Sequence, residues 1–300
     1  MRKDWIEQDV VLDTGPLAVP GTLTLPSSGP AGAGVVLLSG GGPFDRDASS
    51  GPNKPLRDLA WGLASHGVAV LRFDKATHLD VTLMTSPGFT MTEEYVPHAV
   101  AALDLLQKHA RRVFVVGHSM GGKIAPRVAA AHPGVAGLVT LAADAQPMHR
   151  SAVRVLSYLA SVGDDPAVKE LAEEVARQAA AVDDPGLTAD TPAADLPLGL
   201  PGSYWLELRD YDPVAAASAL ELPMLLLQGG RDYQVTVADD LSLWRAGLGH
   251  RPDVTIRVYE ADDHLFFPGE GPSTPESYLA AQHVDPVVID DIAEWLRENI

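Results

Sequence analysis

Short apolar runs alternate with helical patterns along most of this chain, and this alternation restricts the possible folds more than any other feature. Buried strands are expected at Gly34–Ser39, Val68–Phe73, Val113–Val116, Val135–Leu141, Pro223–Gln228 and Val254–Tyr259. Helices are expected at Pro55–Ser65, Thr92–His109, Lys123–Ala131, Val237–Leu248 and Pro286–Glu298. Strands separated by helices need crossover connections, which produce a parallel sheet with helices on both faces. The predicted class is therefore α/β, with a doubly wound and mostly parallel sheet.

The N-terminal region follows a different pattern from the rest. Two apolar stretches, Val10–Leu12 and Leu17–Leu25, are separated by the turn residues Asp13–Pro16. Two such runs joined by a short turn are typical of an antiparallel pair of strands. We expect an opening β-hairpin or meander at the edge of the sheet.

The alternation stops between residues 146 and 218. Two helical stretches there are followed by a turn-rich segment that prolines and aspartates interrupt. A disordered linker is the alternative interpretation. Five large side chains argue against a disordered linker, because such side chains are usually buried: Tyr204, Trp205, Leu206, Leu208 and Tyr211. We predict one core formed by residues 1–145 and 219–300, with residues 146–218 inserted as a helical lid or cap.

The segment Gly117–Gly121 reads GHSMG and matches the pattern G-x-S-x-G. In that motif a serine occupies a sharp turn between a strand and a helix, and the glycines allow the two to pass closely. The pattern alone would occur by chance in about one chain in ten of this length. Here an apolar run precedes it directly and a helical stretch follows. The context favours Ser119 as a nucleophile over an ordinary turn.

A serine hydroxyl is a weak nucleophile without a general base, usually a histidine that a carboxylate orients. With this motif the chain order is Ser, acid and then His, and the acid and the His lie on loops after later strands. His264 follows the last predicted strand, at the edge where ligands bind, and His283 is the reserve candidate. Asp232 follows the preceding strand, and Asp144 is the rival carboxylate. The predicted catalytic residues are Ser119, Asp232 and His264.

A glycine-rich loop, Ser39–Pro43, follows the first parallel strand. Acyl transfer places negative charge on a carbonyl oxygen, and backbone N–H groups held in position stabilise that charge. Glycines let the backbone approach a substrate closely. We expect the N–H groups of Gly41 and Met120 to form an oxyanion hole. An ordinary flexible loop is the alternative, and a phosphate-binding loop is disfavoured because neither G-x-G-x-x-G nor a Walker lysine follows.

Composition excludes several functions. The formal net charge is -18, which disfavours binding to nucleic acid or to anionic membrane surfaces. There is no cysteine, so disulfides, thiolate metal sites and cysteine nucleophiles are excluded. Met1–Trp5 leads into charged residues without a signal sequence, and no apolar run approaches the roughly 20 residues that span a bilayer. We predict a cytoplasmic protein and make no prediction of its oligomeric state.

Several blocks of the chain resemble bacterial esterases of the α/β-hydrolase fold. The blocks are Ser39–Asp47, Gly51–Pro55, Asp58–Ala64, Leu71–Lys75, Pro201–Val214 and Leu227–Val235. In that family the first loop commonly reads HGSGPxDRD, and here Ser39 replaces the usual histidine. The Asp45–Asp47 cluster matches the family pattern; we favour salt-bridged support of the loop over contact with substrate.

The resemblance implies a carboxylesterase that acts on small esters with short acyl chains, through the triad Ser119, Asp232 and His264 and without a cofactor or metal. A thioesterase, amidase or acyltransferase would use the same triad. A non-catalytic ligand-binding protein is less favoured, because all three candidate residues are present. Tyr204, Trp205 and Leu206 are candidates for a substrate pocket, with core packing as an equal interpretation.

Overall fold

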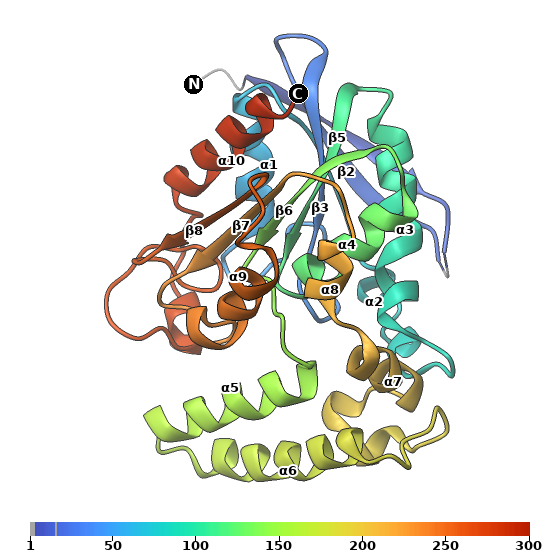
Figure 1. The fold of residues 1–300 in the computed structure, drawn as a ribbon, viewed down its shortest axis with the longest axis vertical. Coiled ribbons are helices and arrows are strands. Elements are labelled where there is room, and N and C mark those ends of the chain that lie inside the picture. Colours follow the sequence, from blue (N-terminus) through green and yellow to red (C-terminus); the bar gives the residue numbers. More distant parts are fainter. Residues whose placement is uncertain (1–3, 16) are drawn as a thin grey trace.

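A single mixed sheet forms the centre of the protein (Figure 1). In the computed structural model, which describes residues 4–15 and 17–300, the sheet has eight strands in the order β1-β2-β4-β3-β5-β6-β7-β8. The strands are β1 (Trp5–Leu12), β2 (Val19–Pro26), β3 (Ala31–Leu38), β4 (Ala69–Phe73), β5 (Ala110–His118), β6 (Val135–Leu141), β7 (Met224–Gly229) and β8 (Val254–Tyr259). β1–β2 and β2–β4 pair antiparallel, and all later neighbours are parallel. The N-terminal hairpin is confirmed, although its predicted turn residue Pro16 lies outside the described residues.

The helices agree closely with the sequence pattern in the core. They are α1 (Pro55–Ser65), α2 (Ala76–Leu79), α3 (Met91–Leu106), α4 (Met120–Ala131), α5 (Met148–Val162), α6 (Pro166–Asp183), α7 (Gly202–Asp210), α8 (Pro213–Ser218), α9 (Ser242–Leu248) and α10 (Pro286–Glu298). One π-helical turn, Val237–Leu241, precedes α9, where an uninterrupted helix was expected. Within the described ranges no helix combines the length and the apolar character needed to cross a membrane.

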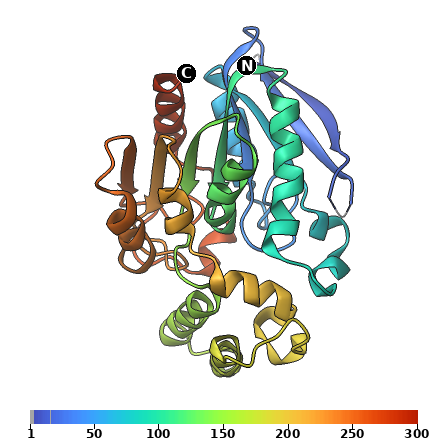
Figure 2. The ribbon, with the colours of Figure 1, turned by 45° about the vertical axis from the view of Figure 1, so that its right-hand side comes forward.

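Helices cover both faces of the sheet, and alternate residues of each strand point to opposite faces. Val35 and Leu37 of β3 pack in one apolar core with α1 and α10. Val36 and Leu38 pack in the other core with α3, α4 and α9. The two groups of helices lie on opposite sides of the strands in Figures 1 and 2. The predicted doubly wound arrangement is confirmed.

The segment between β6 and β7 contributes the helices that lie farthest from the sheet (Figures 1 and 2). α5 and α6 pack against each other there. Polar contacts hold α5 on the core: Arg154 donates to the carbonyl oxygen of Gln234 at 2.9 Å and to Asp240 Oδ2 at 2.9 Å. Ser203 of α7 donates to the carbonyl oxygen of Phe89 at 2.9 Å. The segment is thus ordered on the core, and its role as a lid stays a prediction.

Candidate active site

Ser119 lies in a sharp turn between β5 and α4. Its backbone has φ 53° and ψ -121°, in a region that residues with a side chain rarely adopt. A Cβ on Gly117 would lie 2.2 Å from the carbonyl oxygen of Gly121, and one on Gly121 would lie 2.4 Å from that of Leu38. No side chain fits at either position. The surrounding strands therefore hold the serine in a strained conformation, as the motif predicts.

His264 and Asp232 are brought together from loops after β8 and β7. His264 Nδ1 lies 2.7 Å from Asp232 Oδ2, and both side chains are buried. Asp232 Oδ1 also accepts backbone hydrogen bonds from Gln234 at 2.7 Å and Val235 at 2.9 Å. Burial, the largest single effect, lowers the pKa of His264, but the charge and hydrogen bond of Asp232 help to raise it overall. Asp232 therefore orients the imidazole and favours its protonated form.

A cavity of about 180 Å³ joins the nucleophile to the base, because Ser119 and His264 both line it. His118 lines it as well, and its ring lies 4.7 Å from that of His264 between centroids. His118 Nε2 donates to the carbonyl oxygen of His264 at 2.8 Å. Burial first, and then the charge of His264, lower the pKa of His118 to about 3. His118 is therefore a neutral donor that supports the backbone of His264.

The rival residues are engaged elsewhere. His283 is exposed and lies 3.0 Å from Asp58. Asp144 forms a buried ion pair with Lys123, with Nζ and Oδ2 2.7 Å apart. His283 thus pairs with its carboxylate at an exposed position, and Asp144 pairs with a lysine rather than with a histidine. Across residues 4–15 and 17–300, no group of three or more histidines or carboxylates could hold a metal ion.

The glycine-rich loop passes directly beside the nucleophile. A Cβ on Gly40 would lie 3.3 Å from Ser119 Cβ, and one on Gly41 would lie 3.3 Å from Met120 Cε. The carbonyl oxygen of Gly40 accepts hydrogen bonds from Lys75 Nζ at 3.2 Å and from the Tyr95 hydroxyl at 2.7 Å. Across a trans peptide the next N–H points the opposite way. The Gly41 N–H is thus directed away from Lys75 and Tyr95, and Gly41 lines both cavities beside Ser119.

A buried ion pair behind this loop was not predicted. Lys75 Nζ lies 2.7 Å from Glu94 Oε1, and both side chains are almost fully buried. The Tyr204 hydroxyl donates to Glu94 Oε2 at 2.7 Å. Burial lowers the pKa of Lys75, and the charge of Glu94 opposes that effect. The sequence could have singled out Lys75, because it follows a strand at the edge of the sheet where ligands bind. The spacing of residues along the chain could not predict that its partner is Glu94 on α3.

The Asp45–Asp47 cluster supports the loop. Arg46 binds both carboxylate oxygens of Asp74, through Nε at 2.9 Å and through a terminal nitrogen at 3.0 Å. Asp47 accepts from Arg72 Nε at 2.9 Å, and Asp45 accepts from the backbone N–H of Ser49 at 2.8 Å. These contacts agree with the interpretation as salt-bridged support.

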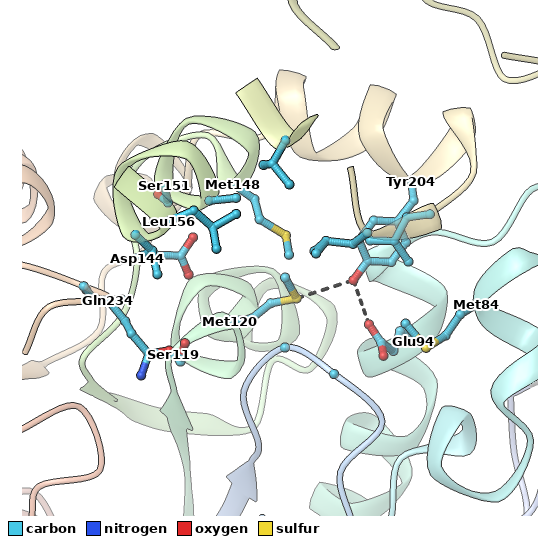
Figure 3. A pocket seen from close by; sticks show the side chains of 18 of the residues that line it. Met84, Glu94, Ser119, Met120, Asp144, Met148, Ser151, Leu156, Tyr204 and Gln234 are labelled. Carbon is cyan, nitrogen blue, oxygen red and sulfur yellow. Dashed lines mark hydrogen bonds between the residues drawn. The ribbon is translucent and has the colours of Figure 1, made fainter. Parts of the chain in front are cut away.

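A second cavity, of about 450 Å³, is also lined by Ser119 (Figure 3). Of the three predicted pocket residues, Tyr204 lines it, whereas Trp205 and Leu206 are not among its lining residues. Trp205 is fully buried in helical packing, and its indole N–H donates to the carbonyl oxygen of Pro197 at 3.2 Å. Successive residues of a helix point in different directions, so three neighbours on α7 do not share one wall. The packing of Trp205 agrees with the alternative interpretation of core packing, and a role of Trp205 or Leu206 in substrate binding stays a prediction.

Residues 54–270 match a family model described as serine aminopeptidase, S33. The chain belongs to this family. The matched range contains Ser119, Asp232 and His264, whereas Gly41 lies before it. Esterase EstD of Thermotoga maritima is 38% identical over 296 residues, which cover 97% of this chain and 67% of that protein.

Solved structures show the same fold at low identity. An esterase of Pyrococcus furiosus has a TM-score of 0.62 at 17% identity and covers 98% of this chain and 91% of its own. Est1E of Butyrivibrio proteoclasticus has a TM-score of 0.60 at 15% identity, and the match covers 97% of this chain and 98% of Est1E. The predicted α/β-hydrolase fold is confirmed for this S33 family member. The predicted enzyme class, a carboxylesterase-type serine hydrolase, is confirmed by the family and by the 38% identical relative.

Proposed function

We propose that this protein hydrolyses small carboxylic esters through an acyl-enzyme on Ser119. The observation that carries the proposal is the 2.7 Å hydrogen bond between His264 and Asp232, at a cavity that Ser119 also lines. The relative named as an esterase supports the choice of an ester as substrate. The loop Ser39–Asp47 supports placement among the HGSGPxDRD-type esterases.

In the first half of the reaction, His264 takes the proton of the Ser119 hydroxyl, and Oγ attacks the acyl carbonyl carbon. The N–H groups of Gly41 and Met120 bind the resulting oxyanion. The carbon–oxygen bond to the alcohol then breaks, and His264 returns its proton to the departing oxygen. Asp232 stabilises the imidazolium while it carries that proton.

In the second half, water replaces the alcohol. His264 takes a proton from the water, whose oxygen attacks the acyl-enzyme, and the acid leaves as Ser119 is reprotonated. We place the segment 146–218 over this site as a lid, because α5 and α7 contribute residues to the larger cavity. We also propose a cytoplasmic location.

A second candidate is amide hydrolysis, which the description of the matching family as serine aminopeptidase favours. The same groups would act, but His264 would protonate an amine. Thioesters and acyl transfer to other acceptors use the same acyl-enzyme. A non-catalytic role is disfavoured by the paired Asp232 and His264.

The test is the variant Ser119→Ala, assayed with p-nitrophenyl butyrate and the matching p-nitroanilide. We expect wild type to cleave the ester faster than the anilide, and the variant to lose about 10⁴-fold or more in kcat. Ser161→Ala, which changes an exposed serine of α5, is the matched control. A fluorophosphonate should label wild type and the control but not Ser119→Ala. Wild-type rates in Ser119→Ala, or no labelling of wild type, would sink the proposal.

A further inference from the structure

Two cavities of unequal size meet at the nucleophile. The larger has a volume of about 450 Å³ and the smaller about 180 Å³. Ser119, Gly41 and Gln234 line both of them. An ester bound with its carbonyl carbon at Ser119 Oγ therefore extends its two halves into two different spaces.

The position of His264 decides which half enters which cavity. His264 lines the smaller cavity and is not among the residues of the larger one. In the proposed reaction His264 gives its proton to the oxygen of the departing alcohol, so that oxygen must lie on the side of His264. The acyl group, which stays on Ser119, extends the other way.

We propose that the larger cavity binds the acyl group and the smaller one the alcohol, so that the substrates are esters of a bulky apolar acid with a small alcohol rather than only the short-acyl esters expected from the sequence. This inference rests on the proposed function. The larger cavity has about 2.5 times the volume of the smaller one, so it accommodates the longer half of an ester better.

The walls of the larger cavity select the chemistry of the acyl group. Apolar side chains come from the core and from the segment above it, among them Phe89, Met148, Val155 and Leu156. Figure 3 shows Met148 and Leu156 on the side of the cavity opposite the β-strands. An apolar chain gains about fourfold in affinity for each methylene that it buries there.

Two carboxylates also line the larger cavity, Glu94 and Asp144. Each forms an ion pair of 2.7 Å with a buried lysine, Lys75 and Lys123 respectively. Both charges are already compensated, and among the described lining residues there is no lysine or arginine to attract an ionised acyl group. A terminal carboxylate on the substrate would lose its hydration there without gaining a cationic partner. The acyl group is therefore neutral as well as apolar.

A pair of isomeric esters tests the assignment on the unmodified enzyme. Methyl octanoate and heptyl acetate have the same atoms and differ only in the side of the ester that carries the long chain. Titration at constant pH measures the acid that each ester releases. We expect kcat/KM to be at least about tenfold higher for methyl octanoate than for heptyl acetate. Equal values, or a preference for heptyl acetate, would overturn the assignment.

The same assay separates the inference from the proposed function. Turnover of p-nitrophenyl butyrate without turnover of methyl octanoate would overturn only the assignment of the cavities. Failure to turn over any ester would sink the proposed function, and this inference with it.

A matched pair of variants on α5 locates the acyl group. Val155 lines the larger cavity, whereas Val162 lies on the same helix and is 52% exposed. Val155→Trp should fill the cavity and lower the ratio of kcat/KM for methyl octanoate over methyl acetate by about tenfold. Val162→Trp should leave that ratio unchanged. An unchanged ratio in a folded Val155→Trp protein would contradict the proposal.

Discussion

The hydroxyl of Tyr95 lies 2.7 Å from the carbonyl oxygen of Gly40, to which it donates a hydrogen bond. The same hydroxyl lies 3.1 Å from the carbonyl oxygen of Ser39, and it accepts from Lys75 Nζ at 2.9 Å. Tyr95 belongs to α3 and is buried behind the loop. A side chain far along the chain thus sets the direction of the N–H group predicted to bind the oxyanion.

Tyr95→Phe removes this hydrogen bond while keeping the ring in place. We expect kcat to fall about tenfold with KM little changed, because the Gly41 N–H acts on charge that develops in the transition state. The affinity for a trifluoromethyl ketone, which forms an oxyanion on Ser119, should fall in parallel.

Tyr158→Phe is the matched control, since it removes a 3.1 Å hydrogen bond from a tyrosine to the carbonyl oxygen of Ser273, and neither residue is among those that line the two cavities at Ser119. Its kcat should stay near wild type. If Tyr95→Phe keeps the kcat and the inhibitor affinity of wild type, the prediction is wrong, and the glycine-rich loop keeps its position without the Tyr95 hydroxyl.

The rate should depend on pH through His264, which acts as a base only when neutral. Because the environment of His264 raises its pKa, kcat/KM should rise with pH, with a midpoint above the ordinary value of 6.5. Asp232→Asn removes the main group that raises this pKa, while burial still lowers it. The midpoint should therefore move to lower pH, and the rate should fall about 10³- to 10⁴-fold.

Asp58→Asn offers a control with the same chemistry, because Asp58 contacts the exposed His283 at 3.0 Å. The pH–rate profile of that variant should match wild type. A midpoint in Asp232→Asn equal to that of wild type would show that another group controls the profile.

Stability should also depend on pH, through Asp262. Both of its carboxylate oxygens are buried and, among the described residues, have no hydrogen-bond partner. Burial first, and then the charges of Asp285 and Asp263, raise its pKa to about 7. The folded protein therefore holds this proton at pH values where the unfolded chain has lost it. As the pH rises from about 4 to about 7, the free energy of unfolding should therefore fall by up to about 4 kcal/mol.

Asp262→Asn cannot ionise, so its stability should fall less than that of wild type between pH 5 and pH 8. Urea denaturation at the two pH values measures this difference. Asp164→Asn, which changes a fully exposed carboxylate, should behave as wild type does. A pH dependence in Asp262→Asn as steep as in wild type would assign the effect to other groups.

Much of the scaffold could be predicted because it depends on local patterns. The bounds of α1 and α10 agree with the sequence, since Pro55 and Pro286 begin helices and Asp285 caps α10 by accepting from the N–H of Val287 at 2.9 Å. The helices α7 and α8 were not predicted individually, because their short apolar patterns are interrupted and their stability comes from packing.

The candidate site, like the scaffold, could be predicted from the sequence only in part. Spacing along the chain singled out Ser119, because an apolar run and a helix flank its motif, and chain order pointed to Asp232 and His264. Spacing could not reveal that Glu94 pairs with Lys75, since no local pattern relates two residues on different elements. Nor could it separate Tyr204 from Trp205, which are adjacent in the chain but point to different surroundings.

By itself, the sequence determined the order of strands and helices, the parallel sheet and the strained serine turn. These follow from hydrophobic periodicity and from glycines where the backbone leaves no room for a Cβ. Only the tertiary structure decided that His264 lies against Asp232, that Lys75 and Tyr95 orient the glycine loop, and that two unequal cavities meet at Ser119. These relationships join segments far apart in the chain, and packing alone brings such segments together.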